Sequence, residues 1–365
     1  MSLKIFATAD VHLGIKFSNF PDNEQKLAMA RLDSLERMVE KAKEVNSDLF
    51  IIAGDLFDRK TTSAETIEKA IDILSRFENF VLILPGNHDY YQTKDDRLWK
   101  KFLEIPDKFI ILNEKRVFNL EDINTFIYPG PCHSRISNEN AIDWIENAIK
   151  NKGAGYHIGI AHGSILNISQ DDCMRYYPMT LDQLESINVD LWILGHTHKQ
   201  YPEVYSKGGK TLVPGSPEVA FGKNFKHDGK AWSITIDNSK EIIAESILVG
   251  KYKIIENNYD LNKININDVL SQLSSLELSK SILKLAFNGR IPINEFEKIK
   301  DIENYLENVF YIETDTKNLK EEITKDNLSQ YPPNSFQYVL LDRLIKEGDN
   351  LALQIAWDLL EGAKK

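Results

Sequence analysis

Short apolar runs alternate with amphipathic stretches over the first hundred residues. Residues 3–9 (LKIFATA), 48–53 (DLFIIA) and 80–84 (FVLIL) are almost wholly apolar, as is typical of strands buried on both faces. Between them, residues 24–45 and 64–77 carry apolar side chains at every third or fourth position, which predicts helices. This alternation predicts parallel strands joined by crossover helices.

The pattern continues to about residue 250. A polar helix is expected near residues 95–104 and a second helix near 138–150. Further strands are expected at 109–112, 115–119, 123–128, 156–161 and 189–194, and antiparallel closing strands at 211–214, 231–236 and 242–249. We therefore expect residues 1–250 to form an α/β sandwich.

The chain changes character beyond residue 250. Residues 251–365 are rich in Lys, Glu, Asn, Leu and Ile and contain no histidine or cysteine. A strand at 284–289, a helix at 292–308 and a strand at 308–314 predict a smaller α+β domain. The amphipathic end, 335–361, is expected to be helical with a break near Gly348. It is interpreted as part of this domain's own core, and binding of a partner by this helix is the alternative.

Composition limits the kind of protein. The net charge is −11, and neither part is basic: residues 1–250 carry 29 Lys+Arg against 36 Asp+Glu, and residues 251–365 carry 15 against 19. Binding to nucleic acid would therefore need local patches, bound metals or a partner chain. The two cysteines, Cys132 and Cys173, lack metal-type spacing and favour a reducing compartment. We see no secretory signal or membrane-spanning segment, so we expect a cytoplasmic protein.

Polar residues that can bind metals follow five of the predicted strands. Because ligands collect at the carboxyl ends of parallel strands, we expect Asp10, Asp55 and Asn87 to share one crevice, and we expect every block to lie in a loop at one edge. The five blocks are Asp10-Val11-His12, Gly54-Asp55, Gly86-Asn87-His88-Asp89, Ala161-His162-Gly163 and Gly195-His196-Thr197-His198.

The residue types in these blocks fit two divalent cations. The Asp55 carboxylate can bridge two metals, Asn87 offers a neutral oxygen, and His196 and His198 can face one metal each. Each block alone has an ordinary explanation, such as a helix cap at Asp55 or a structural histidine after a strand. Together, in this order, they predict a two-metal site that cleaves phosphate esters.

His88 is interpreted as a catalytic group rather than a metal ligand, because the set already holds enough imidazoles. A protonated imidazole facing the substrate could stabilise the transition state or protonate the leaving oxygen. Asp58 and Asp89 are both candidates to orient its ring, and Asp58 is preferred. His133 and His157 are expected to be a loop residue and a strand residue.

The ordered blocks resemble the calcineurin-like metallophosphoesterase superfamily over about residues 3–250. The resemblance implies an αββα sandwich, two Mn²⁺-like ions and attack on phosphorus by a metal-bound hydroxide, assisted by His88. It further implies one metal bound by Asp10, His12, Asp55 and His198, and a second bound by Asp55, Asn87, His162 and His196.

Local detail is similar to the SbcD-type DNA repair exonucleases within that superfamily. The similarity rests on Leu13-Gly14, on Leu56-Phe57-Asp58 and on Pro214-Gly215-Ser216-Pro217-Glu218. It implies a DNA exonuclease or endonuclease whose C-terminal domain, 251–365, is a capping domain that binds substrate or partner. It also implies a homodimer and an SMC-like partner ATPase of the SbcC type.

Two other functions are considered. A phosphatase or a small-molecule phosphodiesterase, such as one acting on cyclic nucleotides, would keep the same site and change only the substrate. A protein-binding scaffold of the same fold would be expected to lose ligands, and all seven are present.

Overall fold

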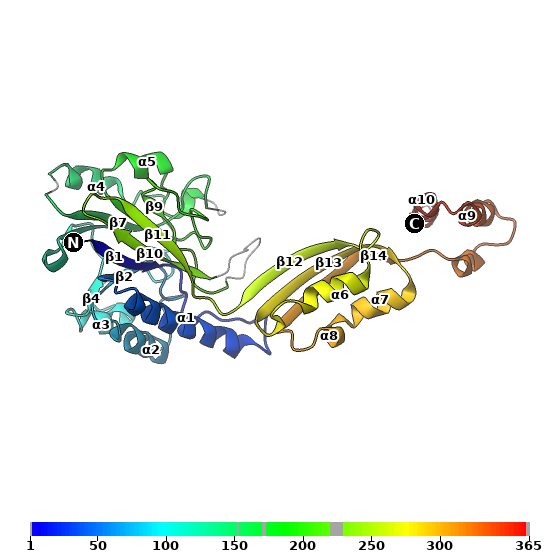
Figure 1. Ribbon diagram of the computed structural model, residues 1–365, viewed down its shortest axis with the longest axis horizontal. Helices are drawn as coiled ribbons and strands as arrows, with labels where there is room; N and C mark the ends of the chain where they lie inside the picture. Colours follow the sequence, from blue (N-terminus) through cyan, green and yellow to red (C-terminus); the bar gives the residue numbers. More distant parts are fainter. Residues whose placement is uncertain (1, 152, 170–172, 220–228, 363–365) are drawn as a thin grey trace. The chain divides into compact units, whose positions relative to one another are not determined.

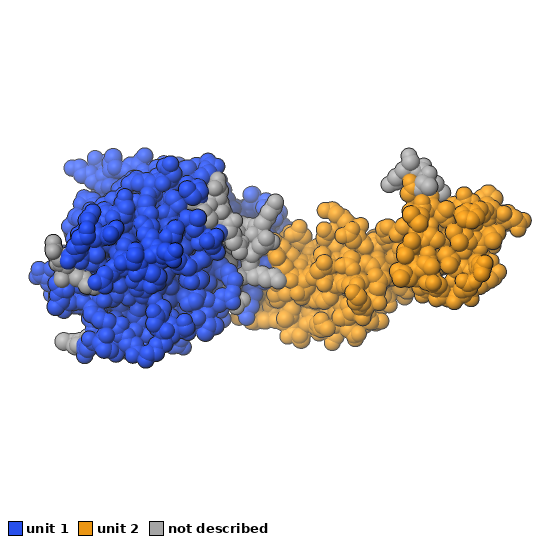
Figure 2. Space-filling model, turned by 90° about the horizontal axis from the view of Figure 1, so that it is seen from above, with its two compact units in different colours: residues 1–254 blue, residues 255–365 orange. Residues whose placement is uncertain are grey.

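The computed structural model describes residues 2–151, 153–169, 173–219 and 229–362. The chain divides into two compact units, Met1–Ile254 and Ile255–Lys365, coloured blue and orange in Figure 2. The division expected at residue 250 lies just before this boundary. Among the described residues, none of the helices combines the length and hydropathy needed to span a membrane.

Six strands form the first sheet of the first unit, in the order β11-β10-β1-β2-β3-β4. Strands β1 to β4 are parallel, and β10 and β11 extend the sheet in antiparallel fashion from β1. The strands are β1 (Leu3–Thr8), β2 (Leu49–Ala53), β3 (Phe80–Leu84), β4 (Phe109–Ile111), β10 (Lys230–Ile236) and β11 (Ile242–Leu248).

Five strands form the second sheet, in the order β5-β6-β7-β8-β9. Strands β6 to β9 are parallel, and β5 is antiparallel to β6. The strands are β5 (Phe118–Leu120), β6 (Thr125–Gly130), β7 (Tyr156–His162), β8 (Leu191–Gly195) and β9 (Thr211–Leu212).

Apolar side chains fill the space between the two sheets, where Ile51 of β2 and Ile158 of β7 belong to one buried cluster. Helices α1 (Glu24–Glu44), α2 (Ala64–Ser75) and α3 (Arg97–Leu103) cover the outer face of the first sheet. Helices α4 (Asp143–Ala148) and α5 (Leu181–Ser186) cover the outer face of the second (Figure 1). The predicted αββα sandwich is confirmed.

Local sequence explains these elements. The central strands are apolar on both faces because one face contacts the other sheet and the opposite face contacts helices. In α1 the buried positions recur at helical spacing, through Leu27, Leu35 and Met38. Helix α2 begins after Ser63, whose side chain accepts a hydrogen bond from the main-chain N–H of Thr66.

One strand prediction is wrong. Residues 211–214 were expected to be an antiparallel closing strand, but β9 lies parallel to β8, with Thr211 opposite Trp192. The loop after β8 returns the chain to the amino end of that strand, where the N–H of Trp192 donates to the carbonyl of Lys210 at 2.6 Å. The other two closing strands are the antiparallel β10 and β11.

The second unit has its own three-stranded sheet, in the order β12-β13-β14, and β13 and β14 are parallel. A buried cluster joins the sheet to helices α6 to α8. The predicted helix 292–308 is divided in two near Asp301, and the predicted break at Gly348 separates the last two helices. The elements are β12 (Lys253–Asp260), α6 (Ile266–Ser274), β13 (Ser281–Ile291), α7 (Ile293–Lys300), α8 (Ile302–Tyr305), β14 (Tyr311–Glu321), α9 (Phe336–Glu347) and α10 (Asn350–Gly362).

Candidate metal centre

The five sequence blocks lie at the carboxyl ends of five strands in the two sheets. Asp10 and His12 follow β1, Asp55 follows β2 and Asn87 follows β3. The second sheet contributes a histidine at the end of β7 and two after β8, namely His162, His196 and His198. The two sheets are joined here, since Nδ1 of His162 is 2.9 Å from the carbonyl oxygen of Ala53. The fold therefore brings all seven residues to one edge of the sandwich.

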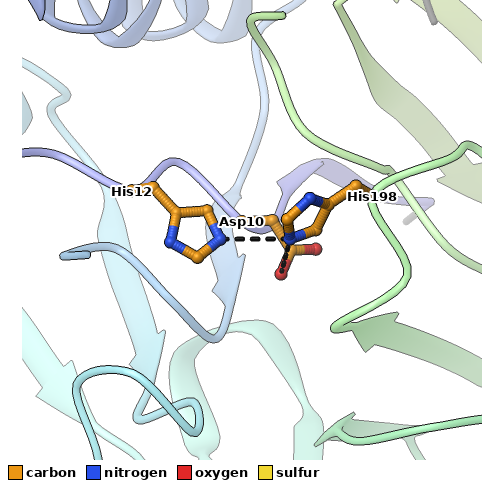
Figure 3. Close-up of side chains that lie close together, drawn as sticks. All are labelled: Asp10, His12 and His198. Atoms are coloured by element: carbon orange, nitrogen blue, oxygen red, sulfur yellow. Dashed lines mark hydrogen bonds and ion pairs between the residues drawn. The ribbon is translucent and has the colours of Figure 1, made fainter. Parts of the chain in front are cut away.

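A first cluster contains Asp10, His12, His198 and one oxygen of Asp55. Nε2 of His12 is 3.2 Å from Nε2 of His198, and the latter is 3.8 Å from Oδ1 of Asp10. Figure 3 shows these three side chains pointing toward one another. Nε2 of His12 is also 3.7 Å from Oδ2 of Asp55. Four potential ligand atoms from three strand ends thus converge.

A second cluster contains Asn87, His162 and His196. Oδ1 of Asn87 is 3.0 Å from Nε2 of His162 and 3.1 Å from Nδ1 of His196. Nε2 of His162 is also 3.4 Å from Oδ2 of Asp55. The Nδ1 atom of His162 faces the Ala53 carbonyl, so a proton on Nδ1 leaves Nε2 free to bind a cation.

Asp55 belongs to both clusters. Its Oδ2 faces His12 in the first and His162 in the second. Its Oδ1 accepts a hydrogen bond from the main-chain N–H of His88 at 2.9 Å, which fixes the carboxylate plane. Asp55 is therefore placed where one carboxylate oxygen can be shared by two cations.

The protonation of the site also fits cations. Burial lowers the pKa of His12 well below its usual range, so this ring is neutral and can offer a lone pair. Burial would raise the pKa of Asp55, yet His162 and His12 hold it well below its usual range. Burial raises the pKa of Asp10 to about 7, because His162 only partly offsets lost hydration and the repulsion from Asp55. Nearby positive charge would therefore stabilise the ionised forms of these buried carboxylates.

The pKa of His162 is shifted by the same buried carboxylates. Burial lowers the pKa of this imidazole, but the carboxylates of Asp55 and Asp10 outweigh burial and raise it to about 9. Without a cation, a protonated His162 would supply the positive charge that these carboxylates attract, and a divalent cation at Nε2 would supply it instead. The oxygen and imidazole donors, their burial and their mutual approach therefore fit a pair of transition-type cations.

Four of these residues have backbone dihedrals that only glycine adopts readily. The φ angles are 53° at Asp10, 49° at His12, 54° at Asp55 and 92° at His196. Each such residue costs about 1–3 kcal/mol and persists only where the surroundings fix it. Backbone strain after three strands, β1, β2 and β8, marks these loops as a site whose geometry lowers the stability of the fold.

Glycines allow the close approach of the loops. An added Cβ at Gly54, whose φ is +92°, would lie 2.0 Å from Nδ1 of His162. At Gly86 an added Cβ would lie 2.2 Å from Oδ1 of Asp55. Any side chain at these two positions would displace a residue of the cluster.

His88 is half-buried beside the first cluster, with its ring centroid 4.9 Å from that of His12. The orientation predicted for its ring needs a correction. Nδ1 of His88 is 2.8 Å from the main-chain carbonyl oxygen of Asp58, so the contact comes from the backbone of Asp58 and not from its carboxylate. The carboxylate lies 3.8 Å from Nδ1 of His12 and accepts hydrogen bonds from Arg59.

Asp89, the other candidate for orienting His88, has a different role. Its carboxylate accepts hydrogen bonds from the main-chain N–H groups of Gly86 at 2.7 Å and Phe57 at 3.0 Å. Asp89 therefore fixes the loop that carries Asn87 and His88. Among the described residues, the hydrogen-bond partners of this carboxylate do not include the ring of His88.

Comparison with known proteins identifies the family. Residues 3–200 match the calcineurin-like phosphoesterases. The chain belongs to this family. The family predicted from the ordered blocks is confirmed, and with it a phosphoesterase fold and a metal-dependent hydrolase class.

Several curated relatives are similar to this phosphoesterase. The DNA double-strand break repair protein Mre11 of Archaeoglobus fulgidus is 28% identical over 232 residues, covering 59% of this chain and 50% of the relative. Mre11 of Saccharolobus solfataricus is 24% identical over 299 residues, covering 79% and 75%. A probable cyclic nucleotide phosphodiesterase of Coxiella burnetii is 24% identical over 187 residues, covering 50% and 71%. The chain spans about half the length of the first curated relatives it matches.

Two buried residues beside the phosphoesterase site, Arg31 and Ser216, had no predicted role in it, although Ser216 belongs to a segment that supports the similarity to SbcD-type exonucleases. Arg31 of α1 is buried and donates to the main-chain carbonyl of Val11, between Asp10 and His12. Ser216 is buried and donates to the main-chain carbonyl of Asp10. In the sequence, Arg31 looks like an ordinary solvated charge on a helix. The one signal of its burial was that it lies on the same face of α1 as the apolar residues Leu27 and Leu35.

Proposed function

We propose that this phosphoesterase is a dinuclear metal-dependent phosphodiesterase that acts on DNA as a nuclease in repair. The observation that carries the proposal is Oδ2 of Asp55, which faces His12 on one side and His162 on the other. A single buried carboxylate oxygen between two sets of imidazoles is the arrangement that a metal pair requires.

The proposed ligand sets follow the two clusters. One cation would be held by Asp10, His12, Asp55 and His198, and the other by Asp55, Asn87, His162 and His196. We propose Mn²⁺ for both, because the set mixes carboxylate and amide oxygens with imidazole nitrogens. When bound, the cations would polarise a phosphoryl oxygen and offset the charge that builds there.

His88 is proposed to assist the leaving oxygen. Its Nδ1 proton donates to the main-chain carbonyl of Asp58, which fixes the ring and leaves Nε2 for the substrate. The ring is half-exposed, whereas Asp10, His12 and Asp55 are buried, so it lies on the accessible side of the clusters. A proton held at Nε2 can pass to the oxygen that departs from phosphorus.

DNA is proposed as substrate because two of the relatives carry the name of a DNA double-strand break repair protein. The acidic balance gives no general basic face, so binding of DNA is assigned to local contacts, to the cations and to residues 251–365 as a capping domain. We further propose a cytoplasmic location, a homodimer and a partner ATPase of the SMC-like, SbcC type.

A small phosphodiester is the second candidate substrate. The Coxiella relative, named as a probable cyclic nucleotide phosphodiesterase, favours it, and the same ligand atoms would serve.

A substrate panel tests the choice. The purified protein with Mn²⁺ would be incubated with single- and double-stranded DNA, a cyclic nucleotide and an aryl phosphate diester. We expect cleavage of DNA, and omission of Mn²⁺ should abolish it. Hydrolysis of the cyclic nucleotide with intact DNA of both kinds would replace the nuclease proposal by the second candidate.

A further inference from the structure

The segment Pro214-Gly215-Ser216-Pro217-Glu218 has no part in the function proposed so far. It is buried from Val213 through Val219, yet none of its side chains belongs to either metal cluster. Its contacts instead reach the main chain of the residues that carry the first cluster.

Ser216 joins two loops that are far apart in the sequence. Its main-chain N–H donates to the carbonyl of His198 at 2.9 Å. Its hydroxyl is 2.9 Å from the carbonyl of Asp10 and 2.9 Å from the carbonyl of Glu218, so one proton is shared between two acceptors. The side chain is 1% exposed. Ser216 thus contacts the backbones of both Asp10 and His198.

Arg31 makes a parallel connection. Its Nη1 donates to the carbonyl of Val11 at 2.6 Å and its Nη2 to the carbonyl of Val219 at 2.8 Å. The guanidinium therefore joins the residue between Asp10 and His12 to the end of the same buried segment.

Glu218 fixes the segment itself. Its carboxylate accepts hydrogen bonds from the main-chain N–H groups of Val219, Lys251 and Tyr252, at 3.1, 2.8 and 3.0 Å. Because Glu218 is fixed by these hydrogen bonds, Ser216 can hold the loops that carry Asp10 and His198 in place.

The first cluster needs such support. Asp10 and His12 both have left-handed backbone dihedrals. Ser216 donates to the carbonyl of Asp10, and Arg31 donates to the carbonyl of Val11, which lies between them. Among the described residues, the side chains of Ser216 and Arg31 and the N–H of Ser216 donate to carbonyls of Asp10, Val11 and His198 and of the segment itself. None of these hydrogen bonds reaches Asn87 or His162.

We propose that Ser216 and Arg31 are positioning residues that hold the Asp10–His12 loop at the separation from His198 that the first metal site requires. The inference rests on the proposed two-metal function. It predicts that loss of the Ser216 hydroxyl weakens one metal site and spares the other. A general loosening of the fold would weaken both.

Calorimetric titration with Mn²⁺ tests the proposal in two backgrounds. His196→Ala leaves the first site as the complete one, and Ser216→Ala added to it should lower the Mn²⁺ affinity about tenfold. His198→Ala leaves the second site complete, and Ser216→Ala added there should leave the affinity within twofold. Ser281→Ala is the matched control, because the buried Ser281 hydroxyl also donates to a carbonyl, that of Glu277 at 2.9 Å, in the second unit.

Three outcomes would overturn the proposal: equal loss in both backgrounds, no loss in the His196→Ala background, or the same loss with Ser281→Ala. If Ser216→Ala melts in EDTA well below Ser281→Ala, Arg31→Lys decides instead. It keeps the charge but not the paired bonds to Val11 and Val219, and it must show the same selective loss. Fewer than two Mn²⁺ ions bound by the wild type would overturn the proposed function and this inference together, whereas two ions with no selectivity would overturn only the inference.

Discussion

At the scale of single residues, Asp55 and His88 divide the chemistry between them. The carboxylate of Asp55 contacts the histidines of both clusters, and its Oδ1 accepts the main-chain N–H of His88. The position of the Asp55 carboxylate therefore also fixes the backbone of His88, the proposed proton donor. The ring of His88 is then fixed separately, through the main-chain carbonyl of Asp58.

Replacing His88 should abolish turnover and spare metal binding. We expect His88→Gln to lower kcat by about 10²–10⁴-fold, the range for losing one acid–base group. Mn²⁺ content per chain should stay at the wild-type value. His133→Gln, at an exposed loop position, is the control and should keep wild-type kcat. A His88→Gln enzyme with near-normal kcat would rule out the proposed role.

Replacing the Asp58 side chain should cost far less. Because the contact with His88 is made by the backbone, Asp58→Ala keeps it and loses only the carboxylate near His12 and its bond to Arg59. We expect kcat to fall by about tenfold, the lower end of the range for loss of an outer contact to a metal ligand. A loss as large as that of His88→Gln would show that the carboxylate orients the ring after all.

At the scale of secondary-structure elements, the site is built from strand ends. The parallel strands of both sheets end at one edge, and the two ends are joined where His162 contacts the carbonyl of Ala53. The left-handed backbone at Asp10, His12 and Asp55 turns the chain sharply after each strand. Rigid strands thereby fix short loops, which is how a site keeps ligand atoms in place.

The junction of β2 and β7 depends on Gly54. Gly54→Ala should lower the affinity of the second metal site, because the new Cβ would displace the ring of His162. Mn²⁺ titration and thermal unfolding would measure both effects, with destabilisation of about 1–3 kcal/mol from the backbone alone.

Gly208→Ala is the control for Gly54→Ala, and it distinguishes backbone strain from the steric conflict with His162. Gly208 has the same φ of +92°, but an added Cβ would meet nothing within 4 Å. We expect this variant to bind Mn²⁺ like the wild type. Equal loss of Mn²⁺ affinity in both variants would mean that the contact with His162 is not what matters.

The sequence predicted the elements more fully than it predicted their contacts. Apolar runs and helical periodicity were enough for β1, β2, β3 and the helices between them. The parallel β9 was missed, because a two-residue strand carries no periodicity and its partner is set by the path of the loop before it. The main-chain contact of Asp58 was missed because a residue's identity does not reveal what its carbonyl group binds.

At the scale of the whole molecule, the residues of the site should lower the free energy of unfolding of the metal-free protein. Buried Asp10 and Asp55 repel each other, and four residues after three of the strands have strained dihedrals, so the metal-free protein is destabilised at this edge. Cations that bind only the folded chain would offset that cost.

Mn²⁺ should therefore raise the melting temperature. At a free concentration of 100 times Kd, one bound ion adds about 2.7 kcal/mol to the free energy of unfolding. We expect a rise of several degrees in calorimetry for the wild type and little or none for Asp55→Asn, which removes the shared charge. A rise of equal size in both proteins would place the ions elsewhere.

The central claim is that Asp55 is shared by two cations. Anomalous diffraction from crystals grown with Mn²⁺ tests it directly. The account predicts two peaks, one between Asp55, His12 and His198 and the other between Asp55, Asn87 and His162. A single peak, or two peaks of which only one contacts Asp55, would contradict it.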